Sequence, residues 1–127
     1  MFDKLIKAIG DWFRGKPPYE YLFSDRFKKD AKKYGKKDRE LQNEMLEFCK
    51  KVRSKDGDTV SKTNGCRKVR MEGKGKGKSG GYRIMVFTEC KNQIHFLHMY
   101  SKNKKKDLTP ADKKALRSVV DEIKKIC

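Results

Sequence analysis

The apolar residues of this chain change their spacing at Cys66, and that change constrains the fold more than any other feature of the sequence. Three later segments alternate between polar and apolar residues or run apolar: 66–71 (CRKVRM), 81–89 (GYRIMVFTE) and 93–101 (QIHFLHMYS). Such segments, rich in β-branched and aromatic residues, are typical of strands. The links between them are a glycine-rich loop and a short turn at 90–92, and short links join antiparallel neighbours. We therefore predict a small antiparallel sheet.

On both sides of this region, apolar residues recur at the spacing of helices. Ser24 and Asp25 are candidate N-caps of one helix and Asp38 of the next, and Thr109 followed by Pro110 opens the last helix. The predicted elements are helices over 2–14, about 25–34, 38 to about 52 and 108–125, a short strand over 19–23 and a loop over 54–65. The fold class is therefore α+β, with N-terminal helices, then the sheet, then a C-terminal helix.

The first predicted helix is strongly amphipathic. Its apolar stripe comprises Phe2, Leu5, Ile6, Ile9 and Phe13. Such a stripe must be buried, either on the protein's own domain, on a partner or at a membrane surface. The sequence alone leaves the first two open and gives little support to a membrane.

Charge is the strongest compositional feature. The chain of 127 residues suits one domain, and it carries 34 Lys and Arg against 17 Asp and Glu, a formal net charge of +17. The basic residues cluster at 28–37, 67–78 and 102–106. Such an excess repels itself unless a polyanion absorbs the field, and nucleic acid is the expected polyanion. The alternative is a basic surface that only keeps the protein soluble.

The cysteines give no sign of a metal or redox site. Cys49, Cys66, Cys90 and Cys127 form no CxxC pair and no Cys/His ligand pattern, so we expect reduced thiols and no zinc. No run of 18 apolar residues occurs, and the N-terminal segment carries charges where a signal peptide would be apolar. We expect a cytoplasmic protein with no membrane partner.

The segment 73–83 (GKGKGKSGGYR) resembles two nucleotide-binding motifs only superficially. A phosphate-binding P-loop needs glycine five residues before Gly77, where Glu72 stands, and a dinucleotide fingerprint must open a helix, whereas a strand follows here. We interpret it as a flexible cationic hairpin loop. Lys74, Lys76 and Lys78 would bind an RNA backbone from it, in a way that weakens with salt.

Several basic side chains should meet on one face of the sheet. Lys68 and Arg70 share a strand face, as do His98, Tyr100 and Lys102, and Arg83 follows the glycine loop. This set suits RNA cleavage without metal, in which a ribose 2′-hydroxyl attacks the adjacent phosphate and an arginine stabilises the growing charge. Lys68, Lys102 or His98 could act as general base or acid.

Each of these assignments has a structural alternative. His95 and His98 lie in an apolar strand, where a histidine is more often structural, and Tyr100 could belong to the core. Residues 104–106 could be a solvated run of charge, although Lys104 is also a candidate RNA contact. The sequence shows no paired carboxylates at a promising spacing and no metal-ligand cluster, which disfavours a metal-dependent nuclease.

Taken together, four motifs resemble the RelE/HigB toxin superfamily, specifically its HigB-like branch, which includes phage-derived proteins. These are GDTV (57–60), the CRKVR strand, GKSGGYR (77–83) and YSKN…DLT (100–109), in this order and at compatible spacing. The resemblance covers about residues 19–126. It divides the chain into an amphipathic N-terminal extension, 1–18, and a toxin domain, 19–127.

The resemblance implies an enzyme without metal or small-molecule cofactor. Relatives pack helices on one side of an antiparallel sheet and present a basic cleft on the other side to the ribosomal A site. There they cut translated messenger RNA, leaving a 2′,3′-cyclic phosphate and a 5′-hydroxyl. By this similarity Lys68 and Arg70 would contact phosphate, Arg83 would stabilise the transition state, and Tyr100 and Lys102 would orient or protonate reacting groups. The implied partner is a HigA-like helix-turn-helix antitoxin.

The sequence departs from the family pattern in two places besides the extension. TNGC (63–66) stands where relatives usually have a glycine pair before a leucine, and Asn103 stands where some have a catalytic arginine. The leading hypothesis is a ribosome-dependent endoribonuclease toxin, and the alternative is a noncatalytic RNA-binding or ribosome-binding module. A DNA-binding regulator is disfavoured, because the basic residues fall on predicted strands and loops rather than on one recognition helix.

Overall fold

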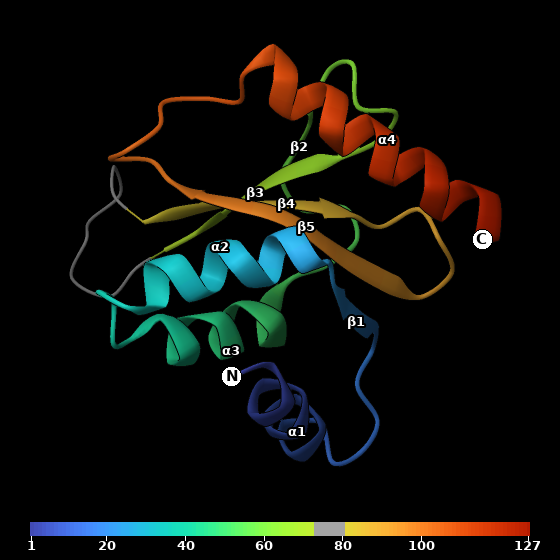
Figure 1. Ribbon diagram of the computed structural model, residues 1–127. Helices are drawn as coiled ribbons and strands as arrows, with labels where there is room; N and C mark the ends of the chain where they lie inside the picture. Colours follow the sequence, from blue (N-terminus) through green and yellow to red (C-terminus); the bar gives the residue numbers. More distant parts are fainter. Residues whose placement is uncertain (73–80) are drawn as a thin grey trace.

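A computed structural model describes residues 1–72 and 81–127 (Figure 1). Its elements, in chain order, are α1 (Phe2–Trp12), β1 (Glu20–Phe23), α2 (Asp25–Gly35), α3 (Leu41–Lys51), β2 (Asp58–Thr59), β3 (Arg67–Met71), β4 (Tyr82–Phe87), β5 (Gln93–Ser101) and α4 (Pro110–Ile126). This arrangement confirms the α+β class and the predicted order of elements. Within this part of the chain, no helix is both long and apolar enough to cross a membrane.

The sheet has five strands in the order β1-β5-β4-β3-β2. β3, β4 and β5 pair antiparallel, as predicted, and β2 also pairs antiparallel with β3. β1, however, runs parallel to β5, from Glu20 opposite Gln93 to Phe23 opposite Phe96. The sheet is therefore mixed rather than wholly antiparallel. Short links enforce antiparallel pairing only between consecutive strands, whereas α2, α3 and three strands separate β1 from β5.

Helices cover both faces of the sheet (Figure 1). α1, α2 and α3 enclose one core with Ile84, Phe96 and Met99, and α4 encloses a second core with Met85, Phe87 and Leu97. The family resemblance implied helices on one side of the sheet and an open cleft on the other, and this expectation is therefore correct only in part. α4 covers part of the second face, so any RNA site there is restricted to the remainder.

The amphipathic stripe of α1 packs on the protein's own domain. Leu5 and Ile9 are 1% and 2% exposed and belong to the first core, and α1 contacts α3. Ile6 and Trp12 stay exposed, and the Lys50 ammonium lies 3.8 Å from the centre of the Trp12 ring. Of the alternatives for this helix, packing on its own fold is the arrangement observed.

Two helices, α2 and α4, begin after a predicted capping residue, and Asp25, the other candidate for α2, is the first residue of that helix. Ser24 Oγ accepts the Phe27 N–H (3.1 Å), and Thr109 and Asp112 form a reciprocal capping box at the start of α4. The prediction that Asp38 caps α3 is wrong, since the helix begins at Leu41. Asp38 instead accepts a hydrogen bond from the Tyr82 hydroxyl at 2.7 Å.

The short strand β2 was not predicted. It forms inside the loop at 54–65, opposite Arg67 and Lys68. Gly57 precedes it with a φ of +74°, and a Cβ there would lie 2.2 Å from the Lys68 carbonyl oxygen. Only glycine permits that backbone conformation and that approach without strain. The Arg67 side chain then donates to the carbonyls of Lys55, Asp56 and Gly57, which holds the loop against β3.

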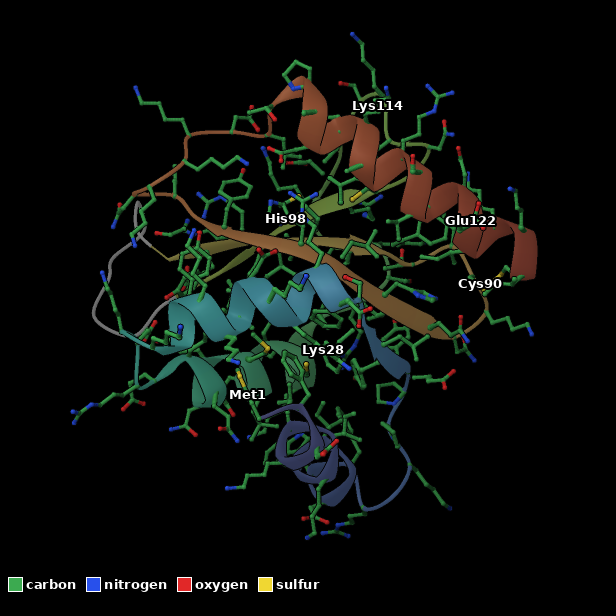
Figure 2. The ribbon with its side chains drawn as sticks, viewed as in Figure 1. Met1, Lys28, Cys90, His98, Lys114 and Glu122 are labelled. Carbon is green, nitrogen blue, oxygen red and sulfur yellow. A yellow bond between two sulfur atoms is a disulfide. The ribbon has the colours of Figure 1, made fainter. Side chains whose placement is uncertain are left out.

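Two cysteines are bonded, contrary to the expectation of reduced thiols. Cys90, after β4, forms a disulfide with Cys127 at the end of α4, with the two Cα atoms 5.7 Å apart. Figure 2 shows Cys90 beside the C-terminal end of α4. Cys49 and Cys66 are free and buried, and burial raises the pKa of each thiol to about 12. Neither is a nucleophile at neutral pH.

Candidate RNA-cleavage site

Three predicted site residues form one row across the sheet. Arg70 on β3 lies opposite Arg83 on β4, and Arg83 lies opposite Tyr100 on β5. Residues directly opposite each other in antiparallel strands point to the same face, with Cβ atoms roughly 5 Å apart. This face is the one that α4 partly covers, since Tyr100 belongs to the α4 core. The row therefore brings two guanidinium groups and a phenol together.

Lys68 lies one step along the same face. It is two residues from Arg70 on β3, and it pairs with Met85, which in turn pairs with His98. Its ammonium is 3.7 Å from Asp107 Oδ1, in the loop before α4. The Leu108 backbone N–H, and then Lys68 and Lys113, lower the pKa of Asp107. Lys68 thus belongs to the site, with a carboxylate beside it.

The Arg70 guanidinium is poorly satisfied. Its Nε and Nη2 atoms are buried and have no hydrogen-bond partner among the described residues, and its nearest ion-pair partner is Glu72 Oε1 at 3.9 Å. Buried donors without acceptors are rare and costly. An incoming phosphate oxygen would supply the missing acceptor and relieve that cost.

Tyr100 is held as a proton donor. The side chain is only 2% exposed, and the Lys105 ammonium lies 5.7 Å from the centre of its ring. Burial, and then the charge of Asp107, raise the pKa of the phenol, whereas Arg83 acts in the opposite direction. The hydroxyl therefore stays protonated at neutral pH. It can donate a proton or a hydrogen bond but cannot serve as a base.

His98 is engaged on both ring nitrogens. Nδ1 is 2.6 Å from Asp30 Oδ2, and Nε2 is 3.4 Å from Nη2 of Arg26, both residues of α2. Figure 2 shows His98 between α2 and α4. His95 on the same strand contacts Gln93 Oε1 at 2.9 Å, and burial lowers its pKa. These contacts favour the structural interpretation of both histidines.

An ionic network that sequence reasoning missed supports the row. Arg26 Nη2 donates to Asp112 Oδ1 at 3.0 Å, and Lys105 forms an ion pair with the other oxygen of Asp112. Burial opposes ionisation of Asp112, but bonds from Lys105, the Thr109 backbone and Arg26 outweigh it and leave its pKa well below the usual value. The network ties α2, the loop after β5 and the start of α4 together beside the Tyr100 ring.

Only part of this network left a signal in the sequence. The capping pattern Thr109-x-x-Asp112 marked the start of α4 and so placed a carboxylate there. No sequence pattern pointed to Arg26, because its contact with Asp112 depends on how α2 crosses the edge of β5. That crossing is a tertiary feature with no local pattern.

The other predicted residues that the structure describes lie outside the paired positions of the sheet. Lys102 is exposed, and its backbone N–H donates to the Gly81 carbonyl (3.2 Å), which places it at the end of the β4–β5 pair. Lys104 lies 5.9 Å from the Tyr34 ring of α2, so it belongs to a different surface. Lys74, Lys76 and Lys78 fall outside the described residues.

Comparison with known families agrees with this geometry. A family model described as the RelE toxin of the RelE / RelB toxin-antitoxin system matches residues 22–127. The match covers the second core, the first core apart from Leu5, Ile9 and Tyr21, and all the strands except the first two residues of β1. It includes the row and its supporting network, and it leaves out α1. The chain belongs to the RelE toxin family and is a toxin of a toxin-antitoxin system.

Proposed function

We propose that this toxin is a ribosome-dependent endoribonuclease that cleaves translated messenger RNA without a metal ion. The observation that carries the proposal is the row of Arg70, Arg83 and Tyr100, flanked by Lys68, on the sheet face that α4 partly covers. Arginines present a planar fork to two phosphate oxygens, and a phenol with a raised pKa is a proton donor.

The chemical step uses these groups in distinct roles. The ribose 2′-hydroxyl attacks the adjacent phosphorus, and the bond to the 5′ oxygen of the next nucleotide breaks. The products are a 2′,3′-cyclic phosphate and a 5′-hydroxyl, so the leaving oxygen must gain the proton that the 2′-hydroxyl loses. In this proposal Arg83 and Arg70 stabilise charge on the nonbridging oxygens, and Tyr100 donates to a reacting oxygen.

The lysines contribute in two ways. Lys68 contacts phosphate, and its link to Asp107 fixes where its ammonium points. Lys102, exposed at the end of the β4–β5 pair, is the candidate that accepts the 2′-hydroxyl proton or assists the leaving group. The cellular partner that we propose is a HigA-like helix-turn-helix antitoxin, which would neutralise the toxin in the cytoplasm.

The test is to express the toxin in cells and map the 5′ ends of messages. The intact toxin should produce new ends inside translated codons, with a 5′-hydroxyl, and Arg83→Gln should remove them. Arg117→Gln removes an exposed arginine of α4 and is the matched control, which should cut normally. Absence of new ends with the intact toxin would refute the proposal.

A noncatalytic ribosome-binding module is the second candidate, and one observation favours it. Tyr100 is buried and Lys68 already has a carboxylate beside it, so neither is freely available to a substrate in this arrangement. Arg83→Gln separates the two candidates. If it abolishes growth arrest while ribosome binding falls only slightly, the toxin is an enzyme, whereas loss of both in proportion favours the module.

A further inference from the structure

A second basic groove lies beyond the edge of β5, apart from the row. We call it the α2-end groove. It has a volume of about 640 Å³, and its cations come from the end of α2, the turn before α3 and the turn after β5. They are Lys33, Lys36, Lys37, Arg39 and Lys104. Figure 1 shows α2 and β5 ending at the same side of the molecule. Segments far apart in sequence thus converge on one basic surface.

These five cations differ in their recorded ion pairs from two lysines beside the row. Lys68 and Lys105 each form an ion pair with an aspartate. In contrast, no carboxylate within residues 1–72 and 81–127 forms an ion pair with any of the five cations of the α2-end groove. Like charges brought together without neutralisation repel each other, so the groove carries a positive electrostatic potential that attracts an external anion.

Two tyrosines form the floor of the groove and fix its shape. The rings of Tyr34 and Tyr82 meet edge to face with centres 5.2 Å apart. The Tyr34 hydroxyl accepts the Ser101 N–H (3.0 Å), and Lys33 and Lys104 lie 5.6 and 5.9 Å from the centre of its ring. One aromatic ring therefore positions two of the five cations.

The carboxylate of the groove is already committed. Asp38 accepts hydrogen bonds from the Tyr82 hydroxyl (2.7 Å) and from the Glu40 N–H (3.1 Å). It is the only acidic residue among the described residues that line the groove. The groove therefore presents positive charge with little internal compensation.

The helix dipole explains only some of these charges. Lysines in the last turn of a helix, such as Lys33, are favoured by the partial negative charge of the carbonyl ends. That effect fades within a turn and accounts neither for Arg39, which follows the helix, nor for Lys104, which comes from the other end of the chain. Their convergence indicates a ligand.

The chemistry of the groove favours RNA over an acidic protein. Its described lining contains no aliphatic side chain, and the only apolar rings are the two tyrosines. Protein interfaces derive most of their affinity from desolvated apolar anchors, which this surface lacks. Lys and Arg grouped around a groove, by contrast, are sufficient to bind a phosphate backbone.

We infer that the α2-end groove binds the phosphate backbone of RNA at a place where the RNA is not cleaved. Tyr82 and Ser101 pair directly beside Arg83 and Tyr100, but neighbouring residues of a strand point to opposite faces. The groove and the row therefore lie on opposite sides of the same end of the sheet. A phosphate held in the groove is not the one attacked at the row. The inference rests on the proposed function only in taking RNA as the polyanion.

The test measures binding alone, so it does not depend on cleavage. The probe is a single-stranded RNA of about 20 nucleotides with 2′-O-methyl groups, which cannot undergo 2′-hydroxyl attack. The variant is Lys36→Gln, Lys37→Gln and Arg39→Gln together, and the control removes the same charge from the N-terminal region, with Lys4→Gln, Lys7→Gln and Lys16→Gln. All six positions are exposed, so both variants should fold. Thermal unfolding checks this.

The expected result is a change in salt dependence. A plot of log binding constant against log salt should become shallower by about 2 in the groove variant, because each lost phosphate contact on single-stranded nucleic acid changes the slope by about 0.7. The control should change it much less. Equal changes in both variants would mean that only net charge matters, and would overturn the inference.

Two further probes separate the sources of the anion. Protein-free ribosomal RNA is the second RNA probe and tests whether the bound backbone belongs to the ribosome. If the groove variant binds either RNA more weakly than the intact protein does, the inference is supported. The RNA whose binding is weakened identifies the source of the phosphate backbone. Polyglutamate of matched charge tests the acidic-protein alternative. If the groove binds polyglutamate as tightly as RNA, the inference is overturned. If the inference fails while 5′-end mapping still shows cuts, the proposed function stands.

Discussion

Arg83 and Tyr100 lie opposite each other on β4 and β5, so the guanidinium and the phenol start from backbone positions that are paired in one rung of the sheet. A rung fixes two side chains more firmly than two loops could, since both backbones are held by the hydrogen bonds between β4 and β5. The buried Tyr100 ring and the charge of Arg83 make this pair the centre of the predicted chemistry.

Removal of one oxygen from this pair tests the role of Tyr100. Tyr100→Phe keeps the ring and its packing, and the hydroxyl forms no hydrogen bond with the described residues, so the unfolding temperature should hardly change. If the hydroxyl donates a proton during cleavage, the single-turnover rate should fall by about 10²–10⁴. An unchanged rate with ribosomes in excess would assign the phenol a packing role only.

The bonded cysteines should stabilise the fold. The Cys90–Cys127 bond closes a chain segment with a sequence separation of 37, for which the loop-entropy relation gives about 4 kcal/mol. Cys127→Ser should therefore lower the free energy of unfolding by a few kcal/mol in urea. The intact protein with a reductant should behave like the variant, and the variant should not respond to reductant. A reductant effect on Cys127→Ser would point to a different bond.

The Asp112 network predicts a loss of stability in acid. Its pKa is lowered from the usual 3.8 in the folded protein, so the unfolded chain binds more protons as pH falls, and stability must fall with it. The contribution is complete above about pH 4 and is lost below it. Asp112→Asn should cost about 1–3 kcal/mol at neutral pH, through its bonds to Arg26 and Thr109.

The fall in stability below about pH 4 can be assigned to Asp112 rather than to another carboxylate by comparing variants. Asp112→Asn should give a shallower fall in stability below pH 4 than the intact protein. Asp121→Asn is a suitable comparison because that residue forms an exposed hydrogen bond with Asn64. If stability falls equally steeply below pH 4 in the intact protein and in Asp112→Asn, Asp112 is not the group responsible.

The approach of Gly57 to β3 predicts a strong effect of a single methyl group. Gly57→Ala places a Cβ 2.2 Å from the Lys68 carbonyl oxygen at a positive φ, so the loop must move away from β3. The unfolding free energy should drop by about 1–3 kcal/mol. Gly10→Ala, where a Cβ meets nothing within 4 Å, is the control and should be neutral or slightly stabilising.

The sequence predicted the elements whose pattern is local. β3, β4 and β5 carry alternating or continuous apolar residues, and α4 carries a complete capping box, so their limits differ from expectation by only a few residues. The row also followed from local rules, because alternation within each strand and short links between strands determine which residues face each other. These rules need no knowledge of the rest of the fold.

The features that were missed depend on distant contacts. β2 exists because Asp58 and Thr59 reach β3, and its two exposed residues carry no strand signal. The disulfide needs α4 to end beside the turn after β4. The position of Lys104 beside Tyr34 on α2 was not predicted, because it depends on the path of the turn after β5. Tertiary arrangement decides each of these outcomes.

Among the residues that the structure describes, no strand pairs with the outer edge of β5 beyond Phe96, but side chains of α2 bind two of its amides. Asp30 Oδ2 accepts the Met99 N–H (3.2 Å) and the Tyr34 hydroxyl accepts the Ser101 N–H (3.0 Å). Amides that are already engaged cannot template a strand from another molecule. The toxin is thereby protected from edge-to-edge aggregation at the very strand that carries Tyr100.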